Sequence, residues 1–317
     1  MNFAAIIKEV GRGVKGSRDL TEEQAEALFG AILDGLVPDM ELGAILLSMR
    51  IKGEAEGELR GFKRALDART PQFSLPAGSP RAIVIPTYNG ARRQPNLAPL
   101  LALLLSRQGL PVLLHGRHDF DSRVSPFELL EALGIRRVAS LAEGQDKLEQ
   151  GKIACVGLEV LCPGLDRLLA LRPRLGVRNS GHSIAKILDP LMGRSARLVA
   201  VTHPEYVERM RVFLNEDKGA ALLMRGTEGE AYANPRRRPQ MEGFLDGRSE
   251  VLFPVEEGGA PPLEGLPDSP ELEANAGCIR AMLEGRQAIP RPILDQAAAC
   301  LYLSGKAATL EAATRLL

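Results

Sequence analysis

The spacing of apolar residues changes near residue 81 and gives the chain two kinds of pattern. Before that point, strings such as LTEEQAEALFGAIL and EAEGELRGFKRALDAR place apolar side chains along one face of a helix. Thr21, with Gln24 three residues later, has the spacing of a capping box. Gly53, after the string DMELGAILLSMRIK, is typical of the residue that follows a helix. We therefore predict that residues 1–70 are all helical.

After residue 81 the apolar runs are short and suited to buried strands. They are AIVIP, PVLLHG, KIACVG, ARLVAVT, GAALLMRG and SEVLFPV, and helical strings such as LAPLLALLLSRQG and EYVERMRVFLNE lie between several of them. Strands that alternate with helices indicate an α/β fold with a mainly parallel sheet. Residues 71–80 are typical of a linker, residues 163–195 of additional helix, and residues 254–270 of a long polar loop.

Composition places this pattern in a globular protein with a large core. Of the 317 residues, 45% are apolar and 25% are charged, as in ordinary globular domains. Four cysteines without a CxxC pair and four scattered histidines favour reduced thiols and no structural zinc site. The N-terminus does not resemble a signal peptide, and no run of 18 apolar residues occurs. We expect a soluble, cytoplasmic protein without a membrane partner.

Charge is segregated along the chain, although the formal net charge is zero. Residues 167–197 contain seven basic residues and one acidic residue, whereas residues 250–279 contain seven acidic residues and no basic one. Residues 81–137 contain eight arginines and four acidic residues. Such segregation permits a positive face that attracts a polyanion. The zero net charge therefore does not exclude nucleic acid as a partner.

Several strings resemble anthranilate phosphoribosyltransferase and the wider family of transferases and nucleoside phosphorylases with that fold. They are LTEEQAEALFGAILDG, AILLSMRIKGE, LLHG followed by VSPFELLEALG, LRPRLGVRNSGHSIAKILDPL, and the closing ANA and PRPILDQAAACLYLSGKAATLEAA. The resemblance spans nearly the whole chain and implies the phosphoribosyltransferase class of α/β fold. It implies a small helical domain, residues 1–70 joined by about 163–192, and a large α/β domain, residues 81–162 and 193–317.

The strings that carry chemistry in this family are altered here. The family's pyrophosphate loop GTGGD aligns with PTYNG, so its glycines are replaced, and Pro86 offers no amide N–H. The lysine of the family's KHGNR string is lost. The acidic pair that holds magnesium in the family aligns with Ala231 and Tyr232, which offer no carboxylate. Glu228 and Glu230 are nearby, with Glu230 in a shifted register. We therefore predict no metal, no cofactor and no catalytic residue.

The pattern as a whole, including RGTEGEAYANPRRRP, most resembles the YbiB-type branch of this fold. That resemblance implies a homodimer, paired through the helical domain, that lacks transferase activity and binds DNA or RNA without marked sequence preference. Aromatic residues that would stack on bases are few, which favours contacts to phosphates.

Basic residues at three places are the candidates for phosphate contact; for each, the alternative is an ordinary solvated charge. Arg92 and Arg93 precede a predicted helix N-terminus, whose dipole favours an anion. Arg174 and Arg178 are four residues apart and are predicted to share a helical face, with Lys186 on the next helix. PRRRP is predicted to be an extended loop that exposes its arginines. The candidate set is Arg92, Arg93, Asn96, Arg117, Arg172, Arg174, Arg178, Lys186, Arg194, Arg236, Arg237 and Arg238.

Two other functions stay open on the sequence alone. One is a pentosyltransferase of the anthranilate phosphoribosyltransferase type with an altered donor loop and an unknown acceptor. The other is a protein-interaction scaffold that docks through the acidic residues 250–279. His115, His118 and His182 are candidate acid–base groups, although a structural histidine at a strand end is the commoner case. Asp119 and Asp121 are weak candidates for a metal.

Overall fold

The chain forms two compact units, each assembled from two separate segments. The computed structural model describes residues 1–13, 15–118 and 122–317. The first unit comprises Met1–Pro71 and Leu158–Pro190, and the second comprises Gln72–Gly157 and Leu191–Leu317.

Helices are the only regular secondary structure in the described residues of the first unit, as its apolar spacing predicts. The box of Thr21 and Gln24 is present: each side chain accepts a hydrogen bond from the backbone N–H of the other. Phe29 and Phe62 stack in the core with ring centroids 4.7 Å apart. The helices are α1 (Phe3–Val10), α2 (Glu22–Leu33), α3 (Asp39–Lys52), α4 (Glu56–Asp67), α8 (Leu158–Leu161), α9 (Pro163–Ala170), α10 (Arg172–Leu175) and α11 (Gly181–Ile184), with a 3-10 turn over Ala185–Ile187.

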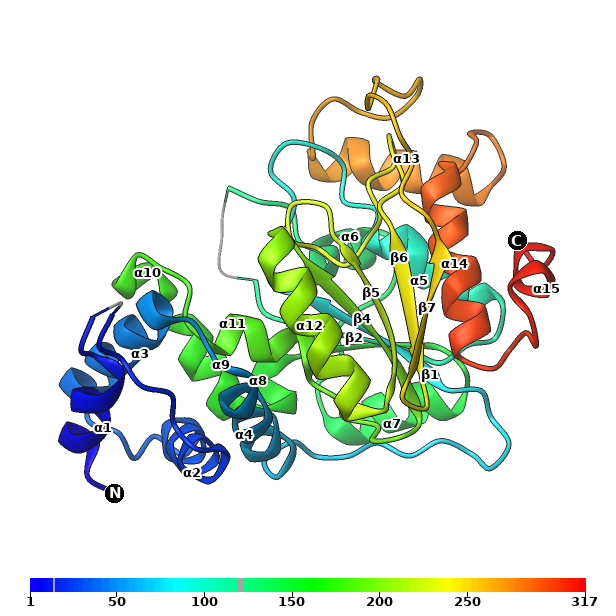
Figure 1. Ribbon diagram of the computed structural model, residues 1–317. Helices are drawn as coiled ribbons and strands as arrows, with labels where there is room; N and C mark the ends of the chain where they lie inside the picture. The colour runs from blue at the N-terminus through cyan, green and yellow to red at the C-terminus, as the bar shows by residue number, and fades with distance from the viewer. Residues whose placement is uncertain (14, 119–121) are drawn as a thin grey trace. The chain divides into compact units, whose positions relative to one another are not determined.

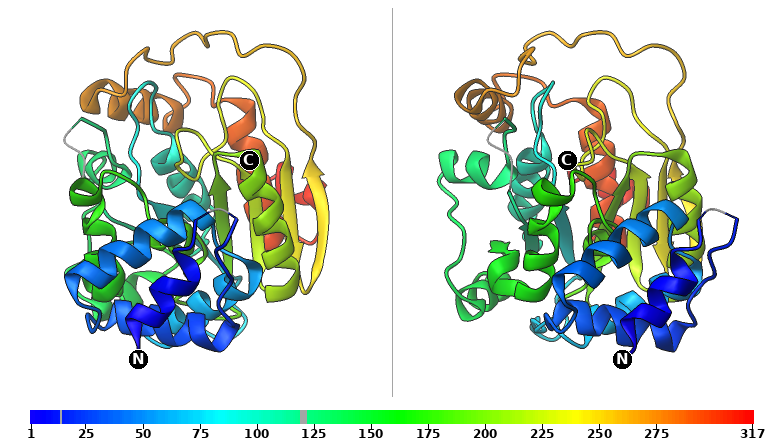
Figure 2. Two further views of the ribbon diagram at one scale, coloured as in Figure 1. Left: turned by 60° about the vertical axis from the view of Figure 1, so that its left-hand side comes forward. Right: turned by 90° about the vertical axis from the view of Figure 1, so that its left-hand side faces the viewer.

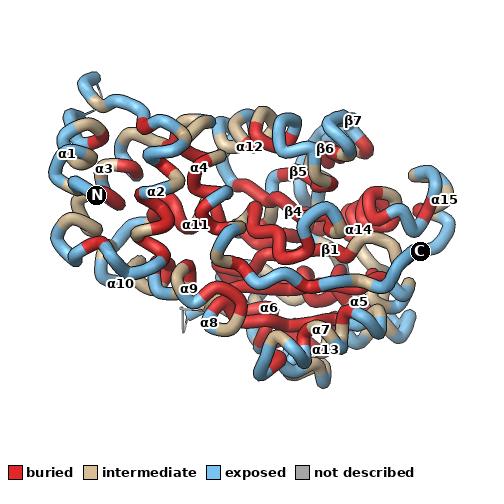
Figure 3. Tube along the Cα trace, turned by 90° about the horizontal axis from the view of Figure 1, so that it is seen from below, coloured by how far each residue is buried: buried red, intermediate tan, exposed pale blue. Residues whose placement is uncertain are grey.

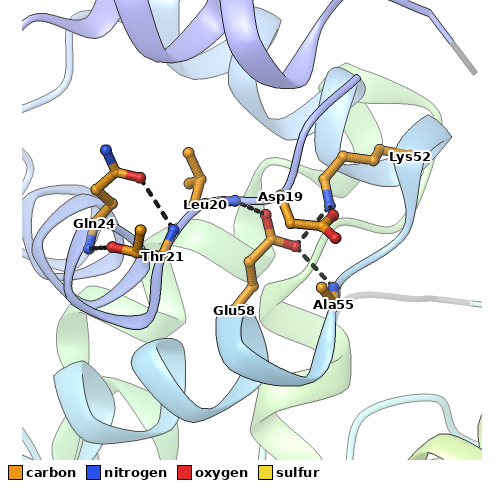
Figure 4. Close-up of polar contacts among 7 residues, drawn as sticks. All are labelled: Asp19, Leu20, Thr21, Gln24, Lys52, Ala55 and Glu58. Carbon is orange, nitrogen blue, oxygen red and sulfur yellow. Dashed lines mark hydrogen bonds and ion pairs between the residues drawn. The ribbon is translucent and has the colours of Figure 1, made fainter. Parts of the chain in front are cut away.

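A buried carboxylate ties the start of α2 to the start of α4 (Figure 4). Glu58 accepts hydrogen bonds from the backbone N–H groups of Leu20 and Ala55, at 2.9 and 2.8 Å. Its charge is balanced by the ammonium of Lys52, 2.7 Å away, which also contacts Asp19 at 2.6 Å. Because the buried charge is both paired and hydrogen-bonded, these contacts offset its desolvation cost and fix the loop geometry.

The second unit is built on a seven-stranded sheet in the order β3-β2-β1-β4-β5-β6-β7 (Figure 1). The first five strands in this order run parallel, and β6 and β7 are antiparallel additions at one edge. The mainly parallel α/β sheet predicted from the apolar runs is therefore confirmed. The strands are β1 (Ala82–Thr87), β2 (Val112–Gly116), β3 (Ile153–Gly157), β4 (Ser195–Val201), β5 (Ala220–Arg225), β6 (Met241–Leu245) and β7 (Arg248–Phe253).

Helices cover the sheet and bury its central strands. Side chains of α5, α13 and α14 join the main apolar core, while α12 packs on β4 and β5. Strands β1 and β4 are buried along their whole length, as their colour in Figure 3 shows. The helices are α5 (Ala98–Arg107), α6 (Pro126–Ala132), α7 (Leu141–Glu149), α12 (Pro204–Asp217), α13 (Leu272–Leu283), α14 (Arg291–Leu303) and α15 (Leu310–Thr314). The predicted polar loop is the long segment between β7 and α13 in Figure 2.

Strand β6 is the one strand that the apolar runs do not predict. Its sequence MEGFL contains a charged residue and a glycine, which are poor strand formers. The carboxylate of Glu242 is half of an ion pair with Arg211 on α12, at 2.9 Å. Tertiary pairing therefore stabilises a strand that the local pattern does not indicate. None of the helices in the described residues is both long and apolar enough to span a membrane.

Candidate nucleic-acid interface

The loop that follows β1 is wrapped around the buried carboxylate of Glu230. This side chain accepts hydrogen bonds from the hydroxyl of Thr87 at 2.7 Å and from the backbone N–H groups of Asn89 and Gly90 at 2.8 and 2.9 Å. The N–H of Tyr88 makes a longer contact of 3.3 Å. Four donors of one loop thus converge on a single internal anion.

A second carboxylate fills the next part of the same loop. Glu228 accepts hydrogen bonds from the backbone N–H groups of Arg92, Arg93 and Gln94, at 3.1, 2.9 and 3.2 Å. The φ of Glu228 is 52°. For any residue other than glycine, this left-handed conformation is unfavourable by on the order of 1 kcal/mol or more. The turn is held in this strained form because its carboxylate lies on the amide groups of the loop.

The turn that carries both glutamates also contacts the loop through its backbone. The side-chain amide of Asn89 donates to the carbonyl of Gly229 at 2.8 Å. Gly229 has a φ of 88°, and a Cβ at this position would lie 2.6 Å from the Asn89 amide nitrogen. Only glycine allows this close approach. In the sequence EGE, the two glutamates therefore flank a glycine. Glu230 bonds to the amide donors of residues 88–90, and Glu228 bonds to those of residues 92–94.

Consecutive backbone N–H groups of this kind form a concavity that binds anions such as phosphate. Here the donors of residues 88–90 and 92–94 already have internal acceptors. An external phosphate would have to displace two carboxylates, one of them fully buried, before it could bind these amides. Sequence comparison places both glutamates near a lost metal site, but it does not reveal that they fill the loop.

The positions that match the family's magnesium pair do not fit a metal ion. Ala231 and Tyr232 are both buried, and the hydroxyl of Tyr232 donates to the carbonyl of Pro95 at 2.9 Å. Burial, reinforced by the nearby carboxylates of Glu228 and Glu230, raises the pKa of Tyr232 well above its ordinary value. No group of three or more His, Cys, Asp or Glu side chains with the geometry of a metal site occurs within residues 1–13, 15–118 and 122–317.

Two of the three histidines considered as acid–base groups, His115 and His182, are held neutral at physiological pH. His115 is fully buried with its Nδ1 2.7 Å from the hydroxyl of Tyr88, and burial lowers its pKa to about 3. His182 belongs to the first unit, where burial, followed by the charges of Arg178 and Arg172, lowers its pKa to about 3. A base this weak is a poor match for proton transfer near pH 7. Asp119 and Asp121 lie outside the described residues.

Around the filled loop, the predicted basic residues differ in how much of their charge remains available. Arg92 and Arg93 are exposed, and their guanidinium groups have no partner among the described residues. Arg117 is half-buried, and its backbone N–H bonds to the carbonyl of Thr87 at 3.1 Å. Asn96 is fully buried and its side-chain oxygen accepts from the N–H of Ala98 at the start of α5. The side chain of Asn96 therefore bonds to the first residue of α5, whose N-cap residue is Leu97.

The string PRRRP does not form an extended, fully exposed loop. It contains a turn, and among its arginines only Arg237 is exposed; its guanidinium donates to the carbonyl of Gly258 at 2.6 Å. Arg238 bonds to the buried carboxylate of Asp295 at 2.5 Å and contacts Glu256 at 3.7 Å. Arg236 is half-buried. The prediction of three exposed arginines is wrong, because the buried carboxylate recruits one of them as its counter-ion.

Arg194 lies at the opposite end of the sheet from the filled loop. It directly precedes β4, and its guanidinium donates to the carbonyls of Pro76 and Ser79 at 3.2 and 3.1 Å. In a parallel sheet the residues before the strands share one edge and the residues after them share the other. The structure therefore separates Arg194 from Arg92 and Arg93.

The first unit carries the remaining candidates, and one expectation about them is wrong. Helix α10 ends at Leu175, and Gly176 follows in a left-handed conformation with a φ of 72°. Arg174 and Arg178 therefore do not share a helical face. Arg174 is 73% exposed in its side chain, with a single contact of 3.9 Å to Asp39. Arg172, Arg178 and Lys186 are half-buried, and Lys186 lies in the 3-10 turn.

Comparisons with known proteins agree with this fold. The glycosyl transferase family helical bundle domain matches residues 4–70. The chain is 42% identical to protein YbiB of Escherichia coli (strain K12), over 98% of this chain and 97% of that protein. It is 29% identical to the anthranilate phosphoribosyltransferase of Sorangium cellulosum (strain So ce56), over 98% and 89% of the two chains.

Among solved structures, the crystal structure of anthranilate phosphoribosyltransferase (TrpD) from Thermus thermophilus superposes with a TM-score of 0.78 at 24% identity. The match covers 100% of this chain and 93% of that chain. The anthranilate phosphoribosyltransferase of Saccharomyces cerevisiae in complex with PRPP and Mg has a TM-score of 0.75 at 14% identity, over 99% and 92% of the two chains. The fold and the identity to YbiB together place this chain in the anthranilate phosphoribosyltransferase-like family, in the branch that contains YbiB.

Proposed function

We propose that this protein binds nucleic acid through its phosphates, without sequence preference, and that it has no phosphoribosyltransferase activity. The observation that carries the proposal is the loop filled by Glu228 and Glu230. In the family that the chain resembles, the corresponding loop holds the pyrophosphate of the donor. Here its amide donors bind internal carboxylates, and the positions of the magnesium pair are occupied by buried Ala231 and Tyr232. The loop therefore lacks both the open amides and the metal ligands that transfer requires.

The available positive charge favours a polyanion over a small substrate. Arg92 and Arg93 project from the filled loop, and the exposed Arg174 lies in the other unit. Guanidinium groups pair well with phosphate, and each phosphate contact releases counterions from the nucleic acid. Base-specific recognition is not expected, because the chain contains no Trp and only 4% aromatic residues. Affinity should then depend on charge and not on sequence.

An exposed apolar face on α3 supports the homodimer that the resemblance implies. Met40, Ala44, Leu47 and Ile51 recur at intervals of four, three and four residues, so they lie on one face of the helix. Met40 is 80% exposed, Leu47 50% and Ile51 58%, whereas the opposite face is buried within the unit. A second copy of this helix is the partner that would cover such a face. Two copies of the basic residues would then act together and raise the apparent affinity.

The direct experiment measures binding of two labelled DNA duplexes of unrelated sequence by fluorescence anisotropy. The proposal predicts affinities within about threefold of each other, and a loss on the order of tenfold for the variant Arg92→Glu/Arg93→Glu. A matched variant, Arg248→Glu/Arg286→Glu, changes the net charge equally at two exposed sites of the same unit. Equal losses in both variants would show that only overall charge matters. Absence of binding, together with capture of a specific protein, would favour the scaffold function instead.

A further inference from the structure

A second row of cations lies at the amino edge of the sheet, away from the filled loop. Lys152, Arg81 and Arg194 directly precede β3, β1 and β4, respectively. The register fixes this alignment, because the carbonyl of Lys152 accepts from the N–H of Val112 and the carbonyl of Arg194 accepts from the N–H of Ala82. Neighbouring strands are separated by about 4.8 Å, so the three positions span roughly 14 Å along the edge.

Two clefts line this edge, and each is basic. One, of about 390 Å³, is lined by Arg81, Arg194 and Lys306 together with small residues of the adjoining turns. The other, of about 280 Å³, is lined by four cations, Arg107, Arg136, Lys147 and Lys152. The lining of both clefts, all of it within the described residues, contains neither a carboxylate nor an aromatic ring.

The two clefts adjoin through a strip of glycine backbone. A Cβ on Gly109 would lie 3.8 Å from the ammonium of Lys306 in the first cleft. A Cβ on Gly151, the residue before Lys152 of the second cleft, would lie 3.2 Å from the carbonyl oxygen of Gly109. Two residues without side chains, Gly109 and Gly151, therefore lie between Lys306 and Lys152, so an extended ligand can approach the main chain closely there.

The charges of these seven residues are little compensated within the chain. Two of the cations reach a carboxylate, Arg81 at Asp246 and Lys147 at Glu143, each at the limiting distance of 4.0 Å. Arg107, Arg194 and Lys152 donate to neutral oxygens of the backbone or of glutamine. Arg136 and Lys306 have no side-chain partner in the part of the chain that the structure describes. By contrast, Arg211 and Arg238 elsewhere in this unit are fully ion-paired.

We infer that this row, the amino-edge rim, is a second surface that binds the phosphate backbone of a nucleic acid. The rim is defined by its seven cations, Arg81, Arg107, Arg136, Lys147, Lys152, Arg194 and Lys306. A span of roughly 14 Å corresponds to about four nucleotides of one DNA strand, at about 3.4 Å each. Ligands of open α/β sheets usually bind at the carboxyl edge, so the rim is separate from the site inherited with the fold. The inference rests on the proposed function and extends the contact surface to both edges of the sheet.

The test compares three proteins in the same DNA-binding assay over a range of salt concentrations. The rim variant is Arg136→Gln/Lys152→Gln/Lys306→Gln, which removes three exposed cations that carry no ion pair. The matched control, Lys8→Gln/Lys15→Gln/Arg248→Gln, removes three exposed cations outside the rim. Each lost phosphate contact makes the negative slope of log affinity against log salt shallower by about 0.9. The slope of the rim variant should be shallower than that of the wild type by about 2 to 3, and the control should keep the wild-type slope.

The outcomes separate the rim from the proposed function. If the full-length wild-type protein does not bind DNA, the proposed function and the rim both fail. If the wild type binds and the Arg92→Glu/Arg93→Glu variant binds weakly, while the rim variant keeps the wild-type slope, only the rim fails. If the rim variant loses binding to phosphatidylserine vesicles but not to DNA, the rim is a membrane-surface site and the inference is overturned. Matching thermal unfolding midpoints for all three proteins would establish that the substitutions leave the fold intact.

Discussion

Glu230 is the residue on which the proposed loss of transferase chemistry depends most directly. A carboxylate carries the same sign of charge as a phosphate and accepts several hydrogen bonds, so it satisfies the amides that would otherwise face a ligand. The carboxylate of Glu230 therefore stabilises the loop, but it also occupies the amides that would otherwise form an open anion site. An acidic residue at this position is thus a structural replacement for the ligand, whereas the sequence alone suggests only a displaced metal ligand.

Replacing Glu230 by alanine should therefore destabilise the second unit. The change leaves the donors of Thr87, Asn89 and Gly90 buried without an acceptor. We expect a loss of about 3 kcal/mol in the free energy of unfolding, measured by urea denaturation, and a smaller loss for Glu230→Gln. Glu257→Gln, at an exposed site, should change stability by less than about 0.5 kcal/mol. An unaltered midpoint for Glu230→Ala would show that the loop does not depend on the carboxylate.

His115 makes stability depend on pH. Its folded pKa of about 3 lies below the ordinary value of 6.5, so the unfolded chain binds the proton more readily. The stability from keeping this group neutral is complete above pH 6.5 and is lost as the pH falls from 6.5 toward 3. We expect the free energy of unfolding to be about 2 kcal/mol lower at pH 5 than at pH 7 from this group.

Urea denaturation between pH 5 and pH 7 measures this dependence. His115→Asn should reduce it by about 2 kcal/mol between pH 7 and pH 5, whatever its effect on absolute stability, and His182, whose pKa is also lowered to about 3, should maintain the remainder. The exposed His203, replaced by glutamine, should leave the dependence as in the wild type. Parallel pH profiles for wild type and His115→Asn would contradict the assignment.

At the scale of elements, local patterns predict most of the architecture and fail where tertiary contacts decide. The capping box at Thr21, the helix end at Gly53 and six of the strands follow from side-chain spacing and turn residues. Strand β6 does not, because its charged residue is stabilised by a partner on α12. The same reason explains Arg238, whose exposure was predicted from its neighbours, whereas Asp295 lies 57 residues away in sequence. Sequence spacing carries no information about such partners.

The apolar face of α3 makes a prediction of its own at this scale. Leu47→Glu places a charge at the centre of the stripe and should convert the proposed dimer to a monomer, as seen by sedimentation velocity at micromolar concentration. Arg248→Glu, at an exposed site of the second unit, should leave the dimer intact. A wild-type protein that sediments as a monomer would exclude this face as a dimer interface.

At the scale of the whole molecule, the resemblance predicts the family and the fold, and both are confirmed by the identity to YbiB and by the superposition on TrpD. The candidate site is less predictable. The twelve candidate residues are divided between the two units, and in the second unit Arg194 lies at the opposite edge from Arg92 and Arg93. Charge counts along the chain identify basic regions, but the fold decides which of their side chains remain unpaired.

The filled loop also predicts how the whole protein responds to the ligands of the related enzymes. Magnesium with phosphoribosyl pyrophosphate, each at millimolar concentration, should leave the thermal unfolding midpoint unchanged to within about 1 °C, because the loop amides are occupied. A ligand present at 100 times its dissociation constant would stabilise the protein by about 2.7 kcal/mol. A clear rise in the midpoint with this pair, absent with other anions, would instead favour the transferase function.

The central claim is that phosphate contacts, and not base recognition or chemistry, account for the binding of nucleic acid. The affinity for two duplexes of unrelated sequence, measured from about 50 to 200 mM salt, tests it most directly. We predict parallel lines of log affinity against log salt, each with a slope of about −4.5 or steeper, as expected for five or more phosphate contacts. A flat salt response, or lines of different slope for the two sequences, would contradict the claim.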